Sequence, residues 1–234
     1  SEHGAIFQCL QGRRPEEVAK LLVTASGGPH FRRPASEFSS ITVEQCLKHP
    51  TWNMGGKITI DSATMFNKGL EVIEAHWLFH MPFDKIEVVI QPQSIIHSMI
   101  EFIDGSVLAQ LGMPDMRLPI QYAFTYPERM TVRGARPIDW KTLGTLEFFP
   151  PDDEKFPSIG LAYEAGHIGG TMPCVLNGAN EVAVYAFLRK EISFTRIFDI
   201  VRTVMERHTV SHDVTLASIR QADAWARRCA ASLL

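Results

Sequence analysis

Residues 86–111, IEVVIQPQSIIHSMIEFIDGSVLAQL, decide the fold class of this chain. The run at 86–90 is short, apolar and rich in β-branched residues, which is typical of a buried strand. Residues 94–102 and 106–111 predict two further strands. They are joined around Asp104-Gly105, a pair that favours the tight turn of a β-hairpin. Together with the helices described next, these strands predict a mixed α/β unit.

Upstream, residues 18–24 (VAKLLVT) predict another strand, which feeds a tight loop at Gly27-Gly28. A helix is expected from the first residues, with Ser1 as its cap. A second, short helix is expected to begin at Thr42, because Gln45 three residues later completes a capping box.

Residues 57–60 predict a short strand, followed by a helix that Asp61 or Ser62 caps and that runs to about residue 79. The apolar positions of this helix follow one another at spacings of four, three and four, which indicates one apolar face. They are Phe66, Leu70, Ile73 and Trp77.

The chain changes character after residue 126. Residues 127–153 carry four prolines and end in two aspartates, so they predict a linker arm. Residues 154–234 show helical spacing in four segments, at 159–165, 174–189, 195–207 and 215–231, which predicts a four-helix bundle. The predicted domains are therefore 1–126, an α/β domain, then the arm at 127–153 and the bundle at 154–234.

Bulk composition excludes several classes of protein. The 234 residues are 45% apolar and 21% charged with a formal charge of −3, so no basic excess indicates a nucleic-acid partner. The apolar runs are too short to cross a bilayer, and the four widely spaced cysteines indicate reduced thiols in a soluble, intracellular protein. The start at Ser1 without Met suits a segment of a longer protein, and it equally suits an engineered start.

The predicted helix after residue 61 carries the strongest candidate site. Asn67, Lys68 and Glu71 share one helix face, where an amide and an ammonium can hold phosphate oxygens and a carboxylate can bind a hard cation. The same spacing also describes a solvated polar face with a weak ion pair. Gly69 inside the helix lowers helix stability by about 1 kcal/mol relative to Ala. Its presence therefore indicates that another group approaches the helix too closely there for a larger side chain.

Two loops that precede this helix in the sequence are further candidates for the site. Residues 49–56 (HPTWNMGG) could form a lid over a polar site or a packed surface loop. Ser26-Gly27-Gly28 could offer backbone N–H groups to a phosphate or serve only as a turn. His97 in its strand is interpreted as a hydrogen-bonded core or interface histidine, and the pairs His76/His80 and His208/His212 lack the central Glu of a zinc-protease helix.

Several stretches together resemble one enzyme family, the 1-deoxy-D-xylulose 5-phosphate reductoisomerases. They are SEHGAIFQ, TASGGPHF, HPTWNMGGKITIDSATMFNKGLEVIEA, PQSIIHSMIEFIDGSVLAQLGMPDM and LNGANEVAV. The resemblance implies an oxidoreductase that rearranges 1-deoxy-D-xylulose 5-phosphate and reduces the product with NADPH to 2-C-methyl-D-erythritol 4-phosphate, for isoprenoid synthesis. It also implies Mg2+ or Mn2+ as cofactor, a homodimer with residues 86–111 as a candidate interface, no nucleic-acid or membrane partner, and a bacterial cytoplasmic or a plastid location.

The resemblance also implies roles for particular residues. Three match catalytic positions, of which the two glutamates are metal ligands: Glu2, Glu71 and His49. Four match the phosphate pocket, over which His49 closes: Ser26, Ser62, Asn67 and Lys68. Three more match positions that contact the substrate, two of them on a flexible flap: Ser1, Trp52 and Met54. Two match positions near the nicotinamide cofactor: Gly55 and Met116.

This sequence departs from the family pattern at three places. The family motif reads Asp-Ser-Glu-His where this chain starts at Ser1, so a third metal carboxylate is not present, and neither is the Gly-rich dinucleotide fingerprint. Gln91 stands where the family often has His. The sequence thus predicts a catalytic and C-terminal portion that does not turn over substrate alone. A phosphate-binding module without catalysis and an oligomerisation unit are the alternatives.

Overall fold

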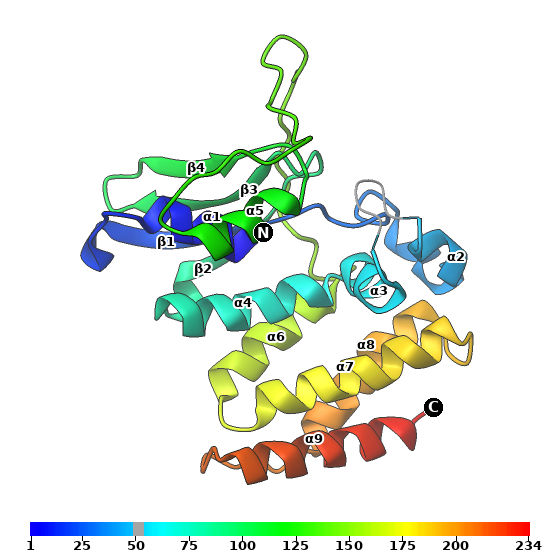
Figure 1. Cartoon of the computed structure of the whole chain (residues 1–234). Coiled ribbons are helices and arrows are strands. Elements are labelled where there is room, and N and C mark those ends of the chain that lie inside the picture. Colours follow the sequence, from blue (N-terminus) through cyan, green and yellow to red (C-terminus); the bar gives the residue numbers. More distant parts are fainter. Residues whose placement is uncertain (49–53) are drawn as a thin grey trace. The chain divides into compact units, whose positions relative to one another are not determined.

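The structure, a computed structural model, describes residues 1–48 and 54–234 of the chain (Figure 1). Its contacts divide it into two compact units. Unit 1 comprises residues 1–26 and 75–151, and unit 2 comprises residues 27–74 and 152–234. The units therefore interleave along the sequence, which differs from the three consecutive segments expected above.

Unit 1 is built on a mixed four-stranded sheet with the order β2-β1-β3-β4. Its strands are β1 (Val18–Ala25), β2 (Ile86–Ile90), β3 (Ile96–Phe102) and β4 (Val107–Leu111). Strand β1 pairs parallel with β2 and antiparallel with β3, and β3 pairs antiparallel with β4. The four strands expected at residues 18–24, 86–90, 94–102 and 106–111 are confirmed, and so is the hairpin, where Gly105 has a φ of 82°.

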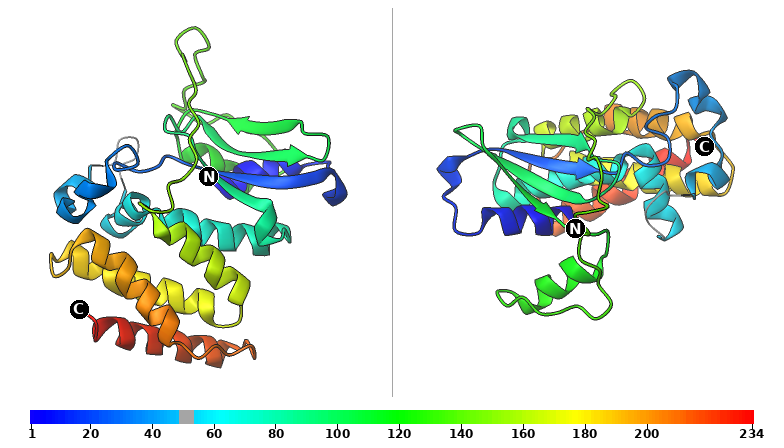
Figure 2. Two further views of the ribbon diagram at one scale, coloured as in Figure 1. Left: turned by 180° about the vertical axis from the view of Figure 1, so that it is seen from behind. Right: turned by 90° about the horizontal axis from the view of Figure 1, so that it is seen from above.

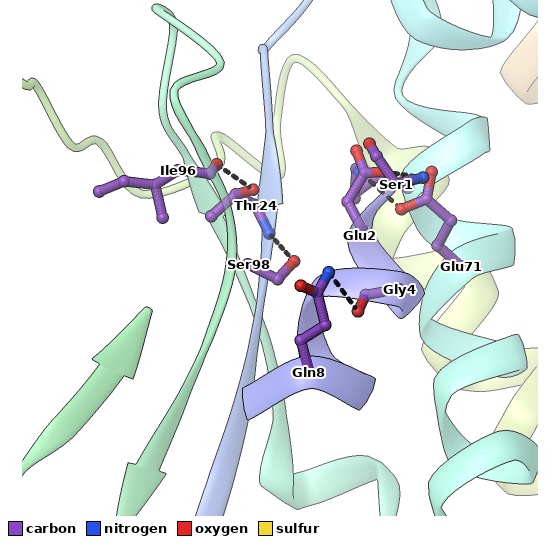
Figure 3. A network of polar contacts seen from close by, with 9 residues as sticks. Ser1, Glu2, Gly4, Gln8, Thr24, Glu71, Ile96 and Ser98 are labelled. Atoms are coloured by element: carbon purple, nitrogen blue, oxygen red, sulfur yellow. Dashed lines mark hydrogen bonds and ion pairs between the residues drawn. The ribbon is translucent and has the colours of Figure 1, made fainter. Parts of the chain in front are cut away.

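Helix α1 (Glu2–Leu10) packs against the sheet and buries Ala5, Ile6 and Cys9 (Figures 1 and 2). A separate apolar cluster forms around Leu22 and Met99. Polar bonds tie the two central strands together, since the Thr24 hydroxyl donates to the Ile96 carbonyl at 2.8 Å (Figure 3). Short 3-10 turns precede β1 and β2, at Pro15–Glu17 and Phe83–Lys85.

Helix α5 (Arg117–Thr125) was not expected from the sequence. Pro119 in a sequence usually indicates a loop. Proline is nevertheless tolerated in the first turn of a helix, where its missing N–H is not needed. The end of the predicted arm returns to the sheet, because the Ile90 and Phe149 backbones exchange two hydrogen bonds of 2.9 and 3.0 Å.

Unit 2 is mainly helical (Figure 2). Its C-terminal helices are α6 (Pro157–Ile168), α7 (Met172–Leu188), α8 (Phe194–Arg207) and α9 (Leu216–Ala231). Helix α7 packs against all three others, which confirms the helical C-terminal region expected from the sequence. Phe194 is fully buried and makes edge contacts with Phe38, Phe187 and Phe198.

The N-terminal part of unit 2 holds a 3-10 turn (Ala35–Ser40), α2 (Val43–Cys46), α3 (Gly56–Thr64) and the start of α4 (Phe66–Phe79). The capping box of Thr42 and Gln45 is confirmed. None of the helices described is long and apolar enough to cross a bilayer.

The strand expected at residues 57–60 is wrong, because these residues lie in α3. The alternation of Ile58, Thr59 and Ile60 imitates a strand over four positions, but helical bonds form instead, and the Thr59 hydroxyl donates to the Gly55 carbonyl at 2.8 Å. The run is too short to fix a period by itself, so burial of the α3 face decides its conformation.

The expected helix start at Asp61 or Ser62 is also wrong. Both residues lie in the last turns of α3. This helix ends at Met65, whose φ of 61° is left-handed, and α4 begins at Phe66. The predicted apolar stripe of α4 holds for Phe66 and Ile73, which are 0% and 8% exposed, but Trp77 is 68% exposed.

Candidate functional site

The candidate site residues that unit 2 brings together are centred on Lys68, in the first turns of α4. Only 1% of the Lys68 side chain is exposed, and its Nζ lies 2.6 Å from Oε2 of Glu71, whose side chain is 17% exposed. An ammonium group is expensive to bury without a charged partner. The solvated polar face that spacing alone left open is therefore wrong for Lys68.

The loop after β1 approaches the last turn of α3. Gly28 has a φ of 67°, and a Cβ at this position would lie 2.5 Å from the Ser62 carbonyl oxygen. Only glycine permits both this conformation and this approach. The glycine loop and the Ser62 backbone are therefore neighbours within unit 2, and Ser62 is buried at 6% exposure.

Gly69 has the close neighbour that its place inside a helix predicted. A Cβ on Gly69 would lie 2.7 Å from the Ala162 Cβ and 3.1 Å from the Ser158 carbonyl oxygen, both on α6. The Ser158 hydroxyl also donates to the Thr64 carbonyl at 2.5 Å. The neighbour is a packed helix rather than a ligand, and this packing fixes the α3–α4 junction that carries Ser62 and Lys68.

The candidate residues of unit 1 lie at the start of α1. Ser1 is the N-cap of this helix, and its hydroxyl donates to Oε2 of Glu2 at 2.9 Å instead of capping a backbone N–H (Figure 3). The Glu2 side chain is 24% exposed. Glu2 thus presents a carboxylate near the surface of its unit.

Comparison with known proteins decides the family. A profile described as DXP reductoisomerase C-terminal domain matches residues 111–229, and one described as 1-deoxy-D-xylulose 5-phosphate reductoisomerase C-terminal domain matches residues 1–79. This chain belongs to the 1-deoxy-D-xylulose 5-phosphate reductoisomerase family. The resemblance read from the sequence motifs is confirmed.

Family members from several bacteria are similar over the whole chain. The 1-deoxy-D-xylulose 5-phosphate reductoisomerases of Chlorobium phaeobacteroides and Geobacillus are 56% and 53% identical over 234 residues, and the chain spans 61% of the length of each.

Solved structures of the family have the same fold. The Zymomonas mobilis reductoisomerase in complex with NADPH superposes with a TM-score of 0.92 at 45% identity, covering all of this chain and 60% of that one. A DOX-P reductoisomerase in complex with NADPH, fosmidomycin and magnesium gives a TM-score of 0.93 at 40% identity, covering all of this chain and 62% of that one. Both comparisons confirm the α/β fold class.

Several residues that the family resemblance singles out lie outside helix α4 or outside the described residues. His49 and Trp52 lie outside the described residues. Met54 is half-buried, and Gly55 is the exposed N-cap of α3. Met116 is 43% exposed directly before α5. These assignments, with those of Ser26 and Asn67, remain predictions from the family resemblance.

Two buried polar residues near the start of β3 have structural explanations. Gln91 is fully buried, and its Oε1 accepts from the Ile95 and Ile96 N–H groups at 2.9 and 3.2 Å, so it closes the turn before β3. His97 is 9% exposed with Nε2 3.1 Å from the Gly112 carbonyl oxygen, and burial lowers its pKa. Its interpretation as a hydrogen-bonded buried histidine is confirmed.

Sequence reasoning missed a cavity of about 250 Å³ in unit 1, lined by residues from α1 and its N-cap, β3, β4 and α5, among them Ser1, His97 and Tyr122. The sequence did not indicate this cavity, because α5, which forms part of its wall, was not expected. Across residues 1–48 and 54–234, no three His, Cys, Asp or Glu side chains gather in a way that could hold a metal ion.

Proposed function

We propose that this chain is the catalytic and C-terminal part of an NADPH-dependent enzyme that converts 1-deoxy-D-xylulose 5-phosphate to 2-C-methyl-D-erythritol 4-phosphate. The single observation that carries this proposal is the buried ion pair of Lys68 and Glu71, on the motif that defines the family. Support comes from relatives that are more than half identical over the whole chain and bear that enzyme's name.

The chemistry of the Lys68 cluster suits a phosphate group. An ammonium has three N–H donors, so Lys68 can contact Glu71 and a phosphate oxygen at the same time. The Ser62 hydroxyl and the Asn67 amide supply further donors from the same junction. Phosphate held there would provide binding energy remote from the reacting carbons, which can be used to orient the substrate for rearrangement.

We also propose Glu2 and Glu71 as ligands of Mg2+ or Mn2+. Carboxylate oxygens are the donors these ions prefer, and Mg2+ is usually held by one or two carboxylates with water or substrate oxygens completing the shell. Each of these glutamates therefore offers the kind of donor that such an ion takes, and the ion when bound would polarise the substrate carbonyl. A related solved structure contains magnesium, and others contain NADPH. Gly55 and Met116 are the proposed contacts to the nicotinamide.

The proposed assembly is a homodimer with the 86–111 hairpin region as its interface. The relatives come from bacteria, so the proposed location is the bacterial cytoplasm.

The phosphate assignment is tested by titrating the chain with fosmidomycin, the phosphonate present in a related structure, in the presence of Mg2+. Lys68→Ala is expected to weaken binding by at least about tenfold, a loss of about 1.4 kcal/mol. Lys20→Ala is the matched control, because Lys20 also pairs with a glutamate, Glu87 at 3.1 Å, but on the surface of β1. Equal affinity of the Lys68 and Lys20 variants would refute the assignment.

The metal assignment needs a second titration. Glu71→Gln is expected to weaken fosmidomycin binding more with Mg2+ than without it, because the carboxylate would contact the ion directly but reach the phosphonate only through Lys68. The reaction itself is tested by NADPH oxidation with 1-deoxy-D-xylulose 5-phosphate in a protein that contains this chain. Undiminished turnover in the Glu71→Gln variant would contradict the proposed catalytic role.

A further inference from the structure

A second polar cluster lies one residue before Ser62 and takes no part in the proposed chemistry. The Asp61 side chain is 1% exposed; its Oδ2 lies 2.5 Å from Nζ of Lys57, one turn earlier on α3. Its Oδ1 accepts a hydrogen bond of 2.9 Å from Nδ2 of Asn180, a fully buried residue of α7. These three side chains join α3 to α7 within unit 2.

The position of Asp61 is unfavourable for a carboxylate by itself. It stands near the C-terminal end of α3, where the helix dipole repels negative charge. Burial raises its pKa, and the nearby Glu181 acts in the same direction, while Lys57 and Asn180 oppose the rise. Well-packed apolar residues usually replace a buried ion pair without loss of stability, so stability alone does not explain this one.

The orientation of the Asn180 side-chain amide also costs free energy. Its Oδ1 is the only buried side-chain nitrogen or oxygen atom of the described residues that has no hydrogen-bond partner. A buried, unsatisfied amide oxygen costs roughly 1–3 kcal/mol. The amide is therefore turned so that its donor serves the Asp61 carboxylate, even though its acceptor is left unused.

The backbone next to this cluster forms part of the candidate phosphate site. Ser62 follows Asp61 directly, and the Ser62 carbonyl is the group that Gly28 approaches so closely that no Cβ fits. Any rotation of the last turn of α3 would therefore move the Ser62 hydroxyl and the glycine loop together. A side chain that fixes this turn also fixes the donors that face a phosphate.

We propose that Asp61 is a positioning residue for the phosphate end of the site, holding Ser62 in place through Lys57 and Asn180. This inference rests on the proposed phosphate-binding function. It concerns residues that do not themselves touch the ligand, so its effect is on ligand affinity through the geometry of the α3 end.

The test is calorimetric titration of the chain with inorganic phosphate. Asp61→Ala is expected to weaken phosphate binding by about tenfold, because displacement of a positioned group by a fraction of an ångström is costly. Asp61→Asn keeps the shape and an acceptor for Asn180, and should restore affinity to within about threefold. Lys57→Met, which removes the more exposed partner, is expected to weaken binding by an intermediate factor and serves if Asp61→Ala does not fold.

Thr171→Ala is the matched control for lost stability. Thr171 is 1% exposed, and its hydroxyl is 2.8 Å from Nε2 of His208, far along the chain from the phosphate residues. This variant should lower the melting temperature as the Asp61 variants do, yet bind phosphate like the unchanged chain. Such a separation of affinity from stability is the result that a merely structural role of Asp61 would not give.

Three outcomes decide between the explanations. Weak binding by Asp61→Ala with recovery in Asp61→Asn supports the positioning role. Unchanged phosphate affinity in Asp61→Ala and Lys57→Met, while Lys68→Ala weakens binding, overturns the positioning role and leaves the phosphate site standing. Absence of phosphate binding by the unchanged chain overturns the proposed phosphate site and the inference with it.

Discussion

Nζ of Lys68 lies 2.6 Å from Oε2 of Glu71, and 1% of the lysine side chain is exposed. Glu71→Gln removes the negative charge beside this buried ammonium, so we expect the free energy of unfolding to fall by about 2 kcal/mol. Lys68→Met removes the buried charge and keeps the volume, so its effect should stay below about 1 kcal/mol. Urea unfolding of both variants measures the difference; equal losses would contradict it.

Gly69 on α4 packs closely against α6, whereas Gly160 on α6 is exposed. Gly69→Ala places a Cβ 2.7 Å from the Ala162 Cβ, so we expect a loss of about 1–3 kcal/mol despite the better helix propensity of alanine. Gly160→Ala on α6 meets nothing within 4 Å and should stabilise the chain by up to about 1 kcal/mol. Thermal unfolding distinguishes the two; a stabilised Gly69→Ala variant would show that α4 and α6 separate easily.

Gly28 is expected to be the more sensitive of two glycines that share a left-handed backbone. Gly105→Ala at φ 82° meets nothing within 4 Å, so it should cost only the conformational penalty of about 1 kcal/mol. Gly28→Ala adds a contact of 2.5 Å to the Ser62 carbonyl and should cost at least about 1 kcal/mol more. It should also weaken phosphate binding, which Gly105→Ala should not. Denaturant titration and calorimetry on the two variants test both parts.

His30 gives stability a defined pH dependence. Its side chain is buried with Nε2 3.3 Å from Sγ of Cys46, and burial, assisted by the charge of Arg33, lowers its pKa to about 4 from 6.5. Between these two pH values the unfolded chain binds a proton at His30 that the folded chain does not, so stability falls as the pH falls.

The contribution of His30 is expected to reach about 1.4 kcal/mol per pH unit across that window. His30→Gln removes this titration, so the difference in unfolding free energy between the variant and the unchanged chain should vary with pH between about 6.5 and 4. Denaturant unfolding at several pH values measures it. A difference independent of pH would mean that folding does not change the pKa of His30.

Local patterns in the sequence were sufficient for much of the fold. The hairpin at Asp104-Gly105, the capping box of Thr42 and Gln45, and the C-terminal helices all formed as expected. Turn chemistry, capping and hydrophobic period act between residues a few positions apart, so they can be read without knowing the rest of the structure. The family motifs also singled out Lys68, Glu71 and Ser62, whose roles at the site remain predictions.

Tertiary structure decided the remainder. Residues 57–60 are helical, Lys68 is buried, and Gly28 lies against the Ser62 carbonyl. Each of these features depends on packing against residues that are distant in the sequence. The contact between Asp61 and Asn180 spans 119 positions and has no local signature at all. The sequence by itself therefore determined the local structure and the residues proposed to carry the chemistry, whereas burial and long-range packing determined which of those residues within one unit are held together, and by which neighbours.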